Sequence, residues 1–279
     1  MINLMQTELL IWLALVLALA AIWQKKHYWP VLLLISILLA LWHQVVTLLG
    51  LTSIALGFLL VVLIKNTSGK KQKVLQFFLP LWAIALAAHQ LPGFNNLLVL
   101  DQVSSGIASI PYTMYLDFDK PMLIFVFIIL IPSMLVSPQQ LKTSNNKELM
   151  LISTALLLFI PVLGIWLNLI NLELSLPSWL PLFIVNNLLL TCVAEEVFFR
   201  GYLQNQLARF GVYPSIIMAG VLFGLAHFAG GIAFVFLATL AGIAYGLIYV
   251  ATGRLSLAIL AHFLFNLYHL LFFTYPLAR

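Results

Sequence analysis

The chain has 279 residues, of which 63% are hydrophobic and only 8% are charged. An ordinary soluble domain is about one quarter charged, so this composition excludes a soluble globular enzyme, a disordered protein and a coiled coil. The net charge of +5 does not indicate nucleic-acid binding, because the basic residues lie mostly in short loops between apolar runs, where they can face anionic lipid. The composition therefore predicts an integral membrane protein with several spans.

Apolar runs of the length that crosses a bilayer, about 20 residues, recur along the chain. They predict an all-α fold, a polytopic transmembrane helical bundle of roughly eight to ten spans, because a helix satisfies its own backbone hydrogen bonds in lipid. The predicted spans are 8–23, 30–43, 45–64, 74–90, 121–136, 149–170, 181–207, 213–228, 231–251 and 255–273. Residues 30–64 fit two spans or one span with a re-entrant piece, and 91–119 is one long connection that we expect to pack on the bundle.

Basic loops alternate with acidic ones. The basic residues after the first, third, fifth, seventh and ninth spans are Lys25, Lys26, Lys65, Lys70, Lys71, Lys73, Lys142, Lys147, Arg209 and Arg254, and the acidic residues between them are Asp101, Asp117, Asp119 and Glu173. Because cytoplasmic loops carry the excess of Lys and Arg, the charges fit about ten spans with the N-terminus outside. The first run is expected to be a retained span and not a signal peptide. A signal peptide has basic residues before its apolar stretch, whereas the residues before Leu9 include Glu8 and no Lys or Arg.

Two adjacent acids lie inside an apolar run. Glu195 and Glu196 follow the apolar residues 188–194. A charged side chain at bilayer depth costs about 2.5 to 3.5 kcal/mol, so this pair should face a wet cavity and find partners. Glu196 and Arg200 are four residues apart and share a helix face, whereas Glu195 points about 100° away. We therefore expect one carboxylate to pair with Arg200 and the other to face the cavity.

Imidazole and amide groups lie in two later apolar runs and predict a polar cavity in the C-terminal third. His227 ends one run, and His262 and Asn266 share a helix face in the last, with His269 roughly continuing the stripe. A poorly solvated carboxylate can act as a general base toward water, and His or Asn can donate to an oxyanion. These groups suit peptide-bond hydrolysis without a covalent intermediate. They could also hold a divalent metal, because His and carboxylate are zinc ligands.

Three motifs, each on its own apolar segment, resemble those of the CAAX prenyl protease and bacteriocin-processing family (Abi, or CPBP). They are Glu195-Glu196-x-x-x-Arg200, Phe223-x-x-x-His227 and His262-x-x-x-Asn266, and their flanks Phe199-Arg200-Gly201-Tyr202-Leu203, Thr252-Gly253-Arg254-Leu255, Gly242 and Gly246 add to the similarity. The resemblance covers about residues 180–270. It implies a transmembrane scaffold at 1–179 and a protease core at 180–273.

The resemblance also implies a function, an intramembrane endopeptidase that cleaves a peptide or the C-terminal region of a membrane-associated protein. The implied roles are water activation by Glu195, assistance by His227, oxyanion binding by His262 and Asn266, and support by Glu196 and Arg200. The family has been described both as metalloproteases and as metal-free glutamate proteases. Since the chain lacks a His-Glu-x-x-His signature, we expect no cofactor, with zinc as the alternative. Bacterial-type relatives process peptides or confer immunity to bacteriocins, which suggests a bacterial inner membrane.

Other interpretations stay open. A proton-coupled transporter also embeds Glu and His, but it predicts broken helices in both halves of the chain, and a non-enzymatic immunity protein could share the scaffold. Cys192 lies one turn before Glu196 and could be a nucleophile, although cysteine is more often a small buried hydrophobe. His269 is expected to be structural. His227 lies near the far end of its short run, so 213–228 is expected to be re-entrant or tilted. The sequence leaves the oligomeric state open.

Overall fold

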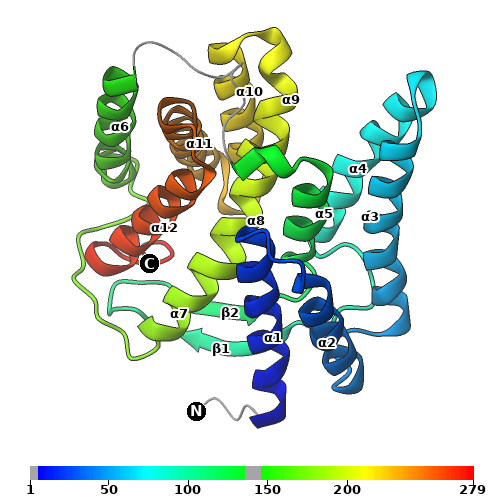
Figure 1. Cartoon of the computed structure of the whole chain (residues 1–279). Coiled ribbons are helices and arrows are strands. Elements are labelled where there is room, and N and C mark those ends of the chain that lie inside the picture. Colours follow the sequence, from blue (N-terminus) through cyan, green and yellow to red (C-terminus); the bar gives the residue numbers. More distant parts are fainter. Residues whose placement is uncertain (1–5, 136–145) are drawn as a thin grey trace. The chain divides into compact units, whose positions relative to one another are not determined.

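The computed structural model describes residues 6–135 and 146–279, so Lys142 and the last residue of the predicted span 121–136 lie outside the described residues. The elements of the first half are α1 (Gln6–Trp23), α2 (Trp29–Trp42), α3 (Leu48–Asn66), α4 (Gly69–Ala87), β1 (Leu97–Val103), β2 (Tyr112–Leu116), α5 (Met122–Leu130) and η1 (Pro132–Leu135). Those of the second half are α6 (Asn146–Trp166), α7 (Leu180–Asn186), η3 (Asn187–Cys192), α8 (Val193–Glu196), η4 (Val197–Gln204), α9 (Asn205–Leu207), η5 (Ala208–Phe210), α10 (Val212–Leu225), η6 (Phe228–Gly230), α11 (Ile232–Thr252) and α12 (Leu255–Phe272). Figure 1 shows the helices that make this an all-α fold, as predicted.

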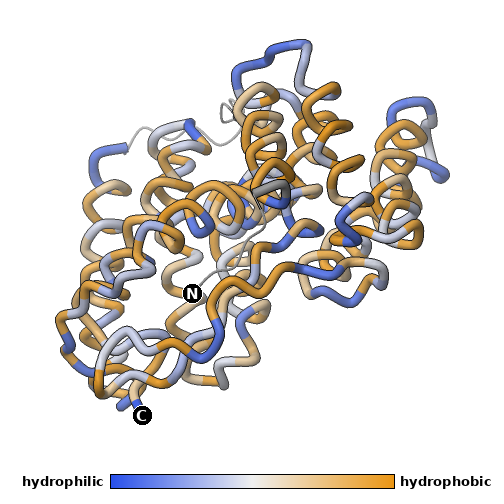
Figure 2. The backbone as a smooth tube through the Cα atoms, turned by 90° about the horizontal axis from the view of Figure 1, so that it is seen from below, coloured by the Kyte–Doolittle hydropathy of each residue, from blue (hydrophilic) through white to orange (hydrophobic). Residues whose placement is uncertain are grey.

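Several helices are long and apolar enough to cross a membrane. Among the described residues, five helices meet both conditions, namely Leu48–Asn66, Asn146–Trp166, Leu180–Phe210, Ile232–Thr252 and Leu255–Phe272. Three apolar helices there are shorter, namely Glu8–Trp23, Trp29–Trp42 and Val212–Leu225. Figure 2 shows hydrophobic residues along the helices and hydrophilic ones gathered at their connections. The chain is therefore a multi-pass integral membrane protein with a polytopic helical bundle.

Two predicted segments differ from the structure. The connection 91–119 contains a two-stranded sheet of β1 and β2, which the sequence analysis took for a loop. The predicted span 121–136 forms only the nine-residue helix α5, because the chain leaves helical geometry at Ile131, next to Pro132. At nine residues α5 is too short to cross a bilayer, and its residues 122–128 are all buried. A helix that is hydrophobic all round belongs in a protein core, and α5 packs against α1 and α3.

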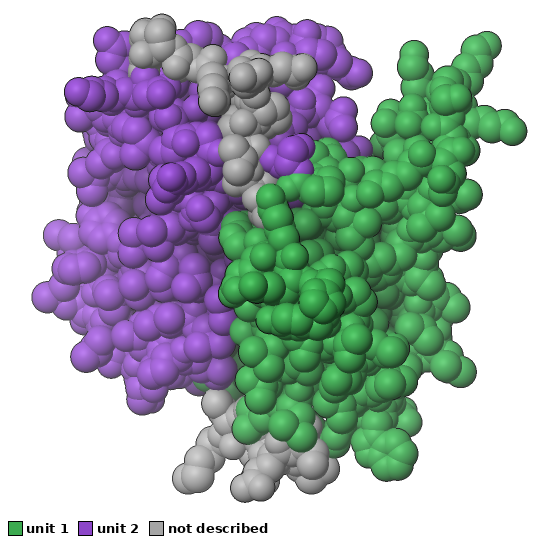
Figure 3. Space-filling view, in the orientation of Figure 1, with its two compact units in different colours: residues 1–100, 114–132 green, residues 101–113, 133–279 purple. Residues whose placement is uncertain are grey.

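The chain divides into two compact units, which Figure 3 shows in different colours. Unit 1 comprises residues 1–100 and 114–132, and unit 2 comprises residues 101–113 and 133–279. All of the predicted site residues fall in unit 2. The expected division into a scaffold at 1–179 and a protease core at 180–273 concerns function and stays a prediction.

A small polar cluster in unit 1 links the end of α4 to the segment before α5. His89 Nδ1 lies 2.7 Å from Oδ2 of Asp119 and His89 Nε2 lies 3.6 Å from Oδ2 of Asp117. The amide of Asn96 donates to Asp119 Oδ1 at 3.0 Å, and Lys120 Nζ lies 3.9 Å from Asp117. The hydrogen bond to Asp119 raises the pKa of His89 above its ordinary value, against the opposing effects of burial and of Lys120.

This cluster predicts a pH-dependent local stability. A raised folded pKa means that protonated His89 stabilises the fold, so the contribution is present below about pH 6.5, the ordinary histidine pKa. It is lost as the pH rises through the raised folded value. We expect amide hydrogen exchange in residues 117–120 to accelerate, beyond the intrinsic rate, as the pH rises above about 6.5. In His89→Gln this extra acceleration should vanish, and its persistence would contradict the assignment.

In unit 2, α10 and α11 pack closely through glycines. A Cβ at Gly220 would lie 2.6 Å from Ile243 Cγ1, and a Cβ at Gly224 would clash with Thr239 Oγ1 and lie 2.6 Å from the carbonyl oxygen of Val235. Small residues four apart allow this close approach between membrane helices. The approach fixes the end of α10, where the predicted site residue His227 follows.

Replacing Gly224 with alanine is therefore expected to destabilise unit 2 by about 1 to 3 kcal/mol, the usual cost of overpacking. Thermal unfolding in detergent measures this effect. The matched control is Gly164→Ala in α6, where the new methyl group meets side-chain atoms and no backbone, at 2.9 Å and 3.0 Å from Ile170 and 3.5 Å from Leu237. Equal unfolding temperatures for Gly224→Ala and wild type would show that this contact is looser than described here.

Candidate active site

The helix that carries the two glutamates is continuous from Leu180 to Phe210 but irregular. It has π-helical geometry in η3 and η4, on both sides of the short α-helical stretch α8 that contains Glu195 and Glu196. Wide turns of this kind are rare and occur mostly at functional sites. Because a π-helical turn holds more residues than an α-helical one, it brings residues five apart, and not four apart, onto one face of the helix.

Glu196 and Arg200 form a fully buried ion pair, as their spacing predicts. Arg200 Nη1 donates to Glu196 Oε1 at 2.9 Å, and both side chains have an exposed fraction of 0%. Arg200 Nη2 donates to the carbonyl oxygen of Gly242 at 2.7 Å. The guanidinium carbon lies 4.7 Å from the ring centroid of Phe223 and 5.3 Å from that of Tyr245. A buried charge needs such partners, and these hold Arg200 against α10 and α11.

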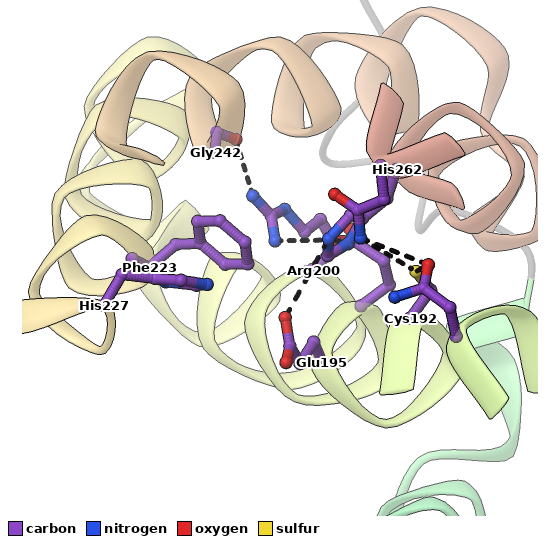
Figure 4. A network of polar contacts seen from close by, with 10 residues as sticks. Cys192, Glu195, Arg200, Phe223, His227, Gly242 and His262 are labelled. Carbon is purple, nitrogen blue, oxygen red and sulfur yellow. Dashed lines mark hydrogen bonds and ion pairs between the residues drawn. The ribbon is translucent and has the colours of Figure 1, made fainter. Parts of the chain in front are cut away.

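His262 lies between the two glutamates (Figure 4). Its Nδ1 lies 2.8 Å from Oε1 of Glu196, and its Nε2 lies 3.9 Å from Oε2 of Glu195. The Glu196 carboxylate is itself held by Arg200, so its position is fixed, and its contact with Nδ1 fixes one edge of the His262 ring. The ring of Tyr245 stacks on His262 at a centroid distance of 4.6 Å and an interplanar angle of 17°. The orientation of His262 is therefore fixed both in the ring plane and across it.

His227 lies in the turn between α10 and α11. Its Nδ1 lies 2.8 Å from the carbonyl oxygen of Phe223, and because a carbonyl only accepts, Nδ1 carries the proton and Nε2 keeps a lone pair. The Phe223 ring lies 4.6 Å from the His227 ring and 5.5 Å from the His262 ring. At 14 residues, α10 is about 21 Å long and too short to cross a hydrocarbon core of about 30 Å. This length favours a re-entrant segment over a tilted span.

A small, largely apolar cavity of about 90 Å³ lies beside these groups. Residues of α6, α11 and α12 line it, and its polar lining consists of His227, Tyr245, His262, Asn266 and His269. His262 and Asn266 lie on one face of α12, as predicted. An apolar cavity with a few converging polar groups is the usual form of a binding site.

The structure places the six predicted site residues in two groups. Glu196 binds both Arg200 and His262, and Glu195 lies 3.9 Å from His262, but neither glutamate is among the residues that line the cavity, which differs from the expectation that one carboxylate faces it. His227 and Asn266 share the cavity with His262. The sequence analysis missed Asn187 and Tyr245. The presence of an amide in an otherwise apolar run, and of a tyrosine between Gly242 and Gly246 on one helix, could have indicated them.

Two further expectations concern Cys192 and His269. The Cys192 thiol is buried and donates to Asn187 Oδ1 at 3.2 Å, and Cys192 is not among the residues that line the cavity. This environment is that of a structural cysteine. His269 lines the cavity, and its Nε2 lies 3.1 Å from the carbonyl oxygen of Thr274.

Fold and site together define a multi-pass helical membrane protein in which buried Glu196 and His262 and the partly exposed Glu195 lie beside an apolar cavity. Residues 177–268 match the family model described as Type II CAAX prenyl endopeptidase Rce1-like, which confirms the resemblance seen in the motifs. The match supports a membrane endopeptidase of the CAAX type that acts on a protein substrate at the membrane. A search of curated proteins finds no match, and neither does a search of solved structures.

Proposed function

We propose that this chain is an intramembrane endopeptidase that cleaves a peptide, or the C-terminal region of a membrane-associated protein, with a water molecule activated by Glu195. The observation that carries the proposal is the position of His262, which lies between the Glu196 and Glu195 carboxylates at the cavity. We place the protein in a bacterial inner membrane, with the lipid bilayer as its surroundings.

The first step needs a base and an electrophile in reach of one water molecule. Glu195 takes a proton from water while the water oxygen attacks the carbonyl carbon of the scissile peptide bond. The lone pair on His227 Nε2 can assist by accepting this same proton from Glu195, because its Nδ1–H is bound to the Phe223 carbonyl. The products of this step are a tetrahedral oxyanion and a protonated base.

The oxyanion needs donors on its other side. His262 donates its Nδ1–H to Glu196, and in the doubly protonated form its Nε2–H can donate to the oxyanion, with an Asn266 N–H as the second donor. Collapse of the intermediate breaks the C–N bond, and the leaving amine takes the proton held by Glu195 or His227. The net reaction adds one water and yields a carboxylate and a protonated amine.

We propose that no metal takes part. In the described portions of the chain, only His89, Asp117 and Asp119 form a group of three possible ligands whose donor atoms lie within 4.8 Å of one another. That cluster lies in unit 1, so Glu195, His227 and His262 as placed do not form a three-ligand set. Cleavage by the purified protein should therefore persist after exhaustive chelation. Loss on chelation and recovery with zinc would favour the metal-dependent alternative.

The activity can be tested without knowing the substrate. Membranes from cells expressing wild type and His262→Ala would be compared by mass spectrometry of peptide termini, with His43→Ala as the control because His43 lies outside the site. We expect a set of new termini in wild type and His43→Ala that is absent in His262→Ala. Identical termini in all three samples would favour a transport or immunity role without proteolysis.

A further inference from the structure

Two asparagines and the single cysteine form a polar cluster one helical turn along α12 from His262. Asn266 Nδ2 lies 3.2 Å from Asn187 Oδ1 and 3.7 Å from Cys192 Sγ. Cys192 Sγ lies 3.2 Å from the same Asn187 oxygen. Asn187 has an exposed fraction of 8% and Cys192 one of 0%, whereas Asn266 lines the cavity.

The π-helical geometry of η3 produces this cluster. Asn187 and Cys192 are the first and last residues of η3, five positions apart. In a regular α-helix, residues five apart point in directions about 140° different. The wider turn lets the Asn187 oxygen accept from the Cys192 thiol of the same helix and from Asn266 of α12.

We infer that Asn187 is a positioning residue for Asn266, and this inference rests on the proposed oxyanion role of Asn266. A carboxamide is planar, so a hydrogen bond from one N–H to Asn187 fixes the direction of the other N–H. The Asn187 oxygen and the Cys192 sulfur lie only 3.2 Å apart, so both face the same N–H of Asn266, and the second N–H is left to donate to an oxyanion in the cavity. Asn187 thus holds the carboxamide through one N–H and sets the direction of the other.

The first test reads the cluster without using activity. Because Cys192 is the only cysteine in the chain, the S–H stretching band in the Raman spectrum of the full-length protein reports this thiol alone. In Asn187→Leu the band should shift to higher frequency, because the thiol loses its acceptor. Asn187→Asp keeps an acceptor oxygen and should keep a lowered frequency. Thr191→Val, next to Cys192 on the same helix, is the matched control and should leave the band unchanged.

The second test measures turnover of an internally quenched peptide that carries the sequence around a His262-dependent cleavage site. Asn187→Leu should lower kcat by about ten- to a hundredfold through misplacement of Asn266, with KM changed less than about twofold. In an Asn266→Ala background, Asn187→Leu should cause no further fall, because the residue that it positions is gone. Asn187→Asp should restore most of the activity.

The outcomes separate this inference from the proposed function. An unshifted S–H band in Asn187→Leu would overturn the positioning role. So would an equal loss of kcat on introducing Asn187→Leu into the wild type and into Asn266→Ala. If Asn187→Leu does not fold, Asn187→Asp is compared with Asn187→Thr, whose shorter side chain does not place an oxygen at the same point. We expect a lowered S–H frequency and a higher kcat in Asn187→Asp than in Asn187→Thr, and equal values in the two variants would overturn the positioning role. If Asn266→Ala cleaves like wild type, the oxyanion assignment fails, and the Raman band still shows whether Asn187 holds the thiol.

Discussion

Replacing Glu195 with glutamine is expected to lower kcat by about 10³-fold while leaving the fold unchanged, because glutamine keeps the shape of the side chain and removes the general base. The Glu195 side chain has an exposed fraction of 19%, and glutamine fills the same space, so the packing around this position is kept. We therefore expect the unfolding free energy to change by less than about 0.5 kcal/mol. Cleavage of the quenched peptide and thermal unfolding of the same preparation measure the two effects.

The control for this variant is Glu148→Gln in the first turn of α6. Glu148 is exposed and lies outside the site, so both measurements should match those of wild type. A Glu195→Gln protein that cleaves at the wild-type rate would remove the base from the proposed mechanism. Simultaneous loss of activity and stability in Glu195→Gln would show that this glutamate is structural.

Replacing Arg200 with methionine should have the largest effect on stability. The change leaves the Glu196 carboxylate buried beside His262 without the guanidinium that binds it at 2.9 Å. Removing one partner of a buried ion pair costs about 3 to 5 kcal/mol, because the other charge stays uncompensated. We expect the unfolding free energy to fall by this amount and cleavage to be lost, since Glu196 then no longer fixes His262.

The double variant Glu196→Gln with Arg200→Met tests the cause. It removes both charges, so it should recover part of the lost stability without recovering cleavage. Unfolding in mild detergent, followed by circular dichroism, compares the wild type, the single variant and the double variant. If the double variant were as unstable as Arg200→Met alone, packing of the side chain and not the unpaired charge would be the source of the loss.

Much of the C-terminal site could be predicted because helical spacing fixes which side chains share a face. The pairs Glu196–Arg200 and His262–Asn266 are four residues apart. In the structure the first pair forms an ion pair, and both members of the second contact the helix that carries Glu196. The separate directions of Glu195 and Glu196 also follow from adjacent positions on one helix. The apolar runs predicted the membrane class for a similar reason, since lipid imposes a length and a composition.

The missed features depend on contacts between distant segments or on irregular backbone. Nothing local to Tyr245 indicates that its ring will stack on His262, which is on the next helix. The role of Asn187 depends on π-helical geometry, which the period of an ordinary helix does not predict. The hairpin of β1 and β2 was missed because its strands lie in a connection that opens with turn-forming residues. The short length of α5 follows from the break at Ile131 before Pro132, a local signal that the hydrophobicity of the run concealed.

The most direct test of the central claim is an experimental structure of the full-length protein bound to a phosphinate analogue of a cleaved peptide. The phosphinate group has the tetrahedral shape of the hydrolytic intermediate. We expect one of its oxygens within about 3 Å of the Glu195 carboxylate, and the other within about 3 Å of His262 Nε2 and Asn266 Nδ2. A phosphinate bound away from these groups, or lipid between Glu195 and His262, would contradict the account.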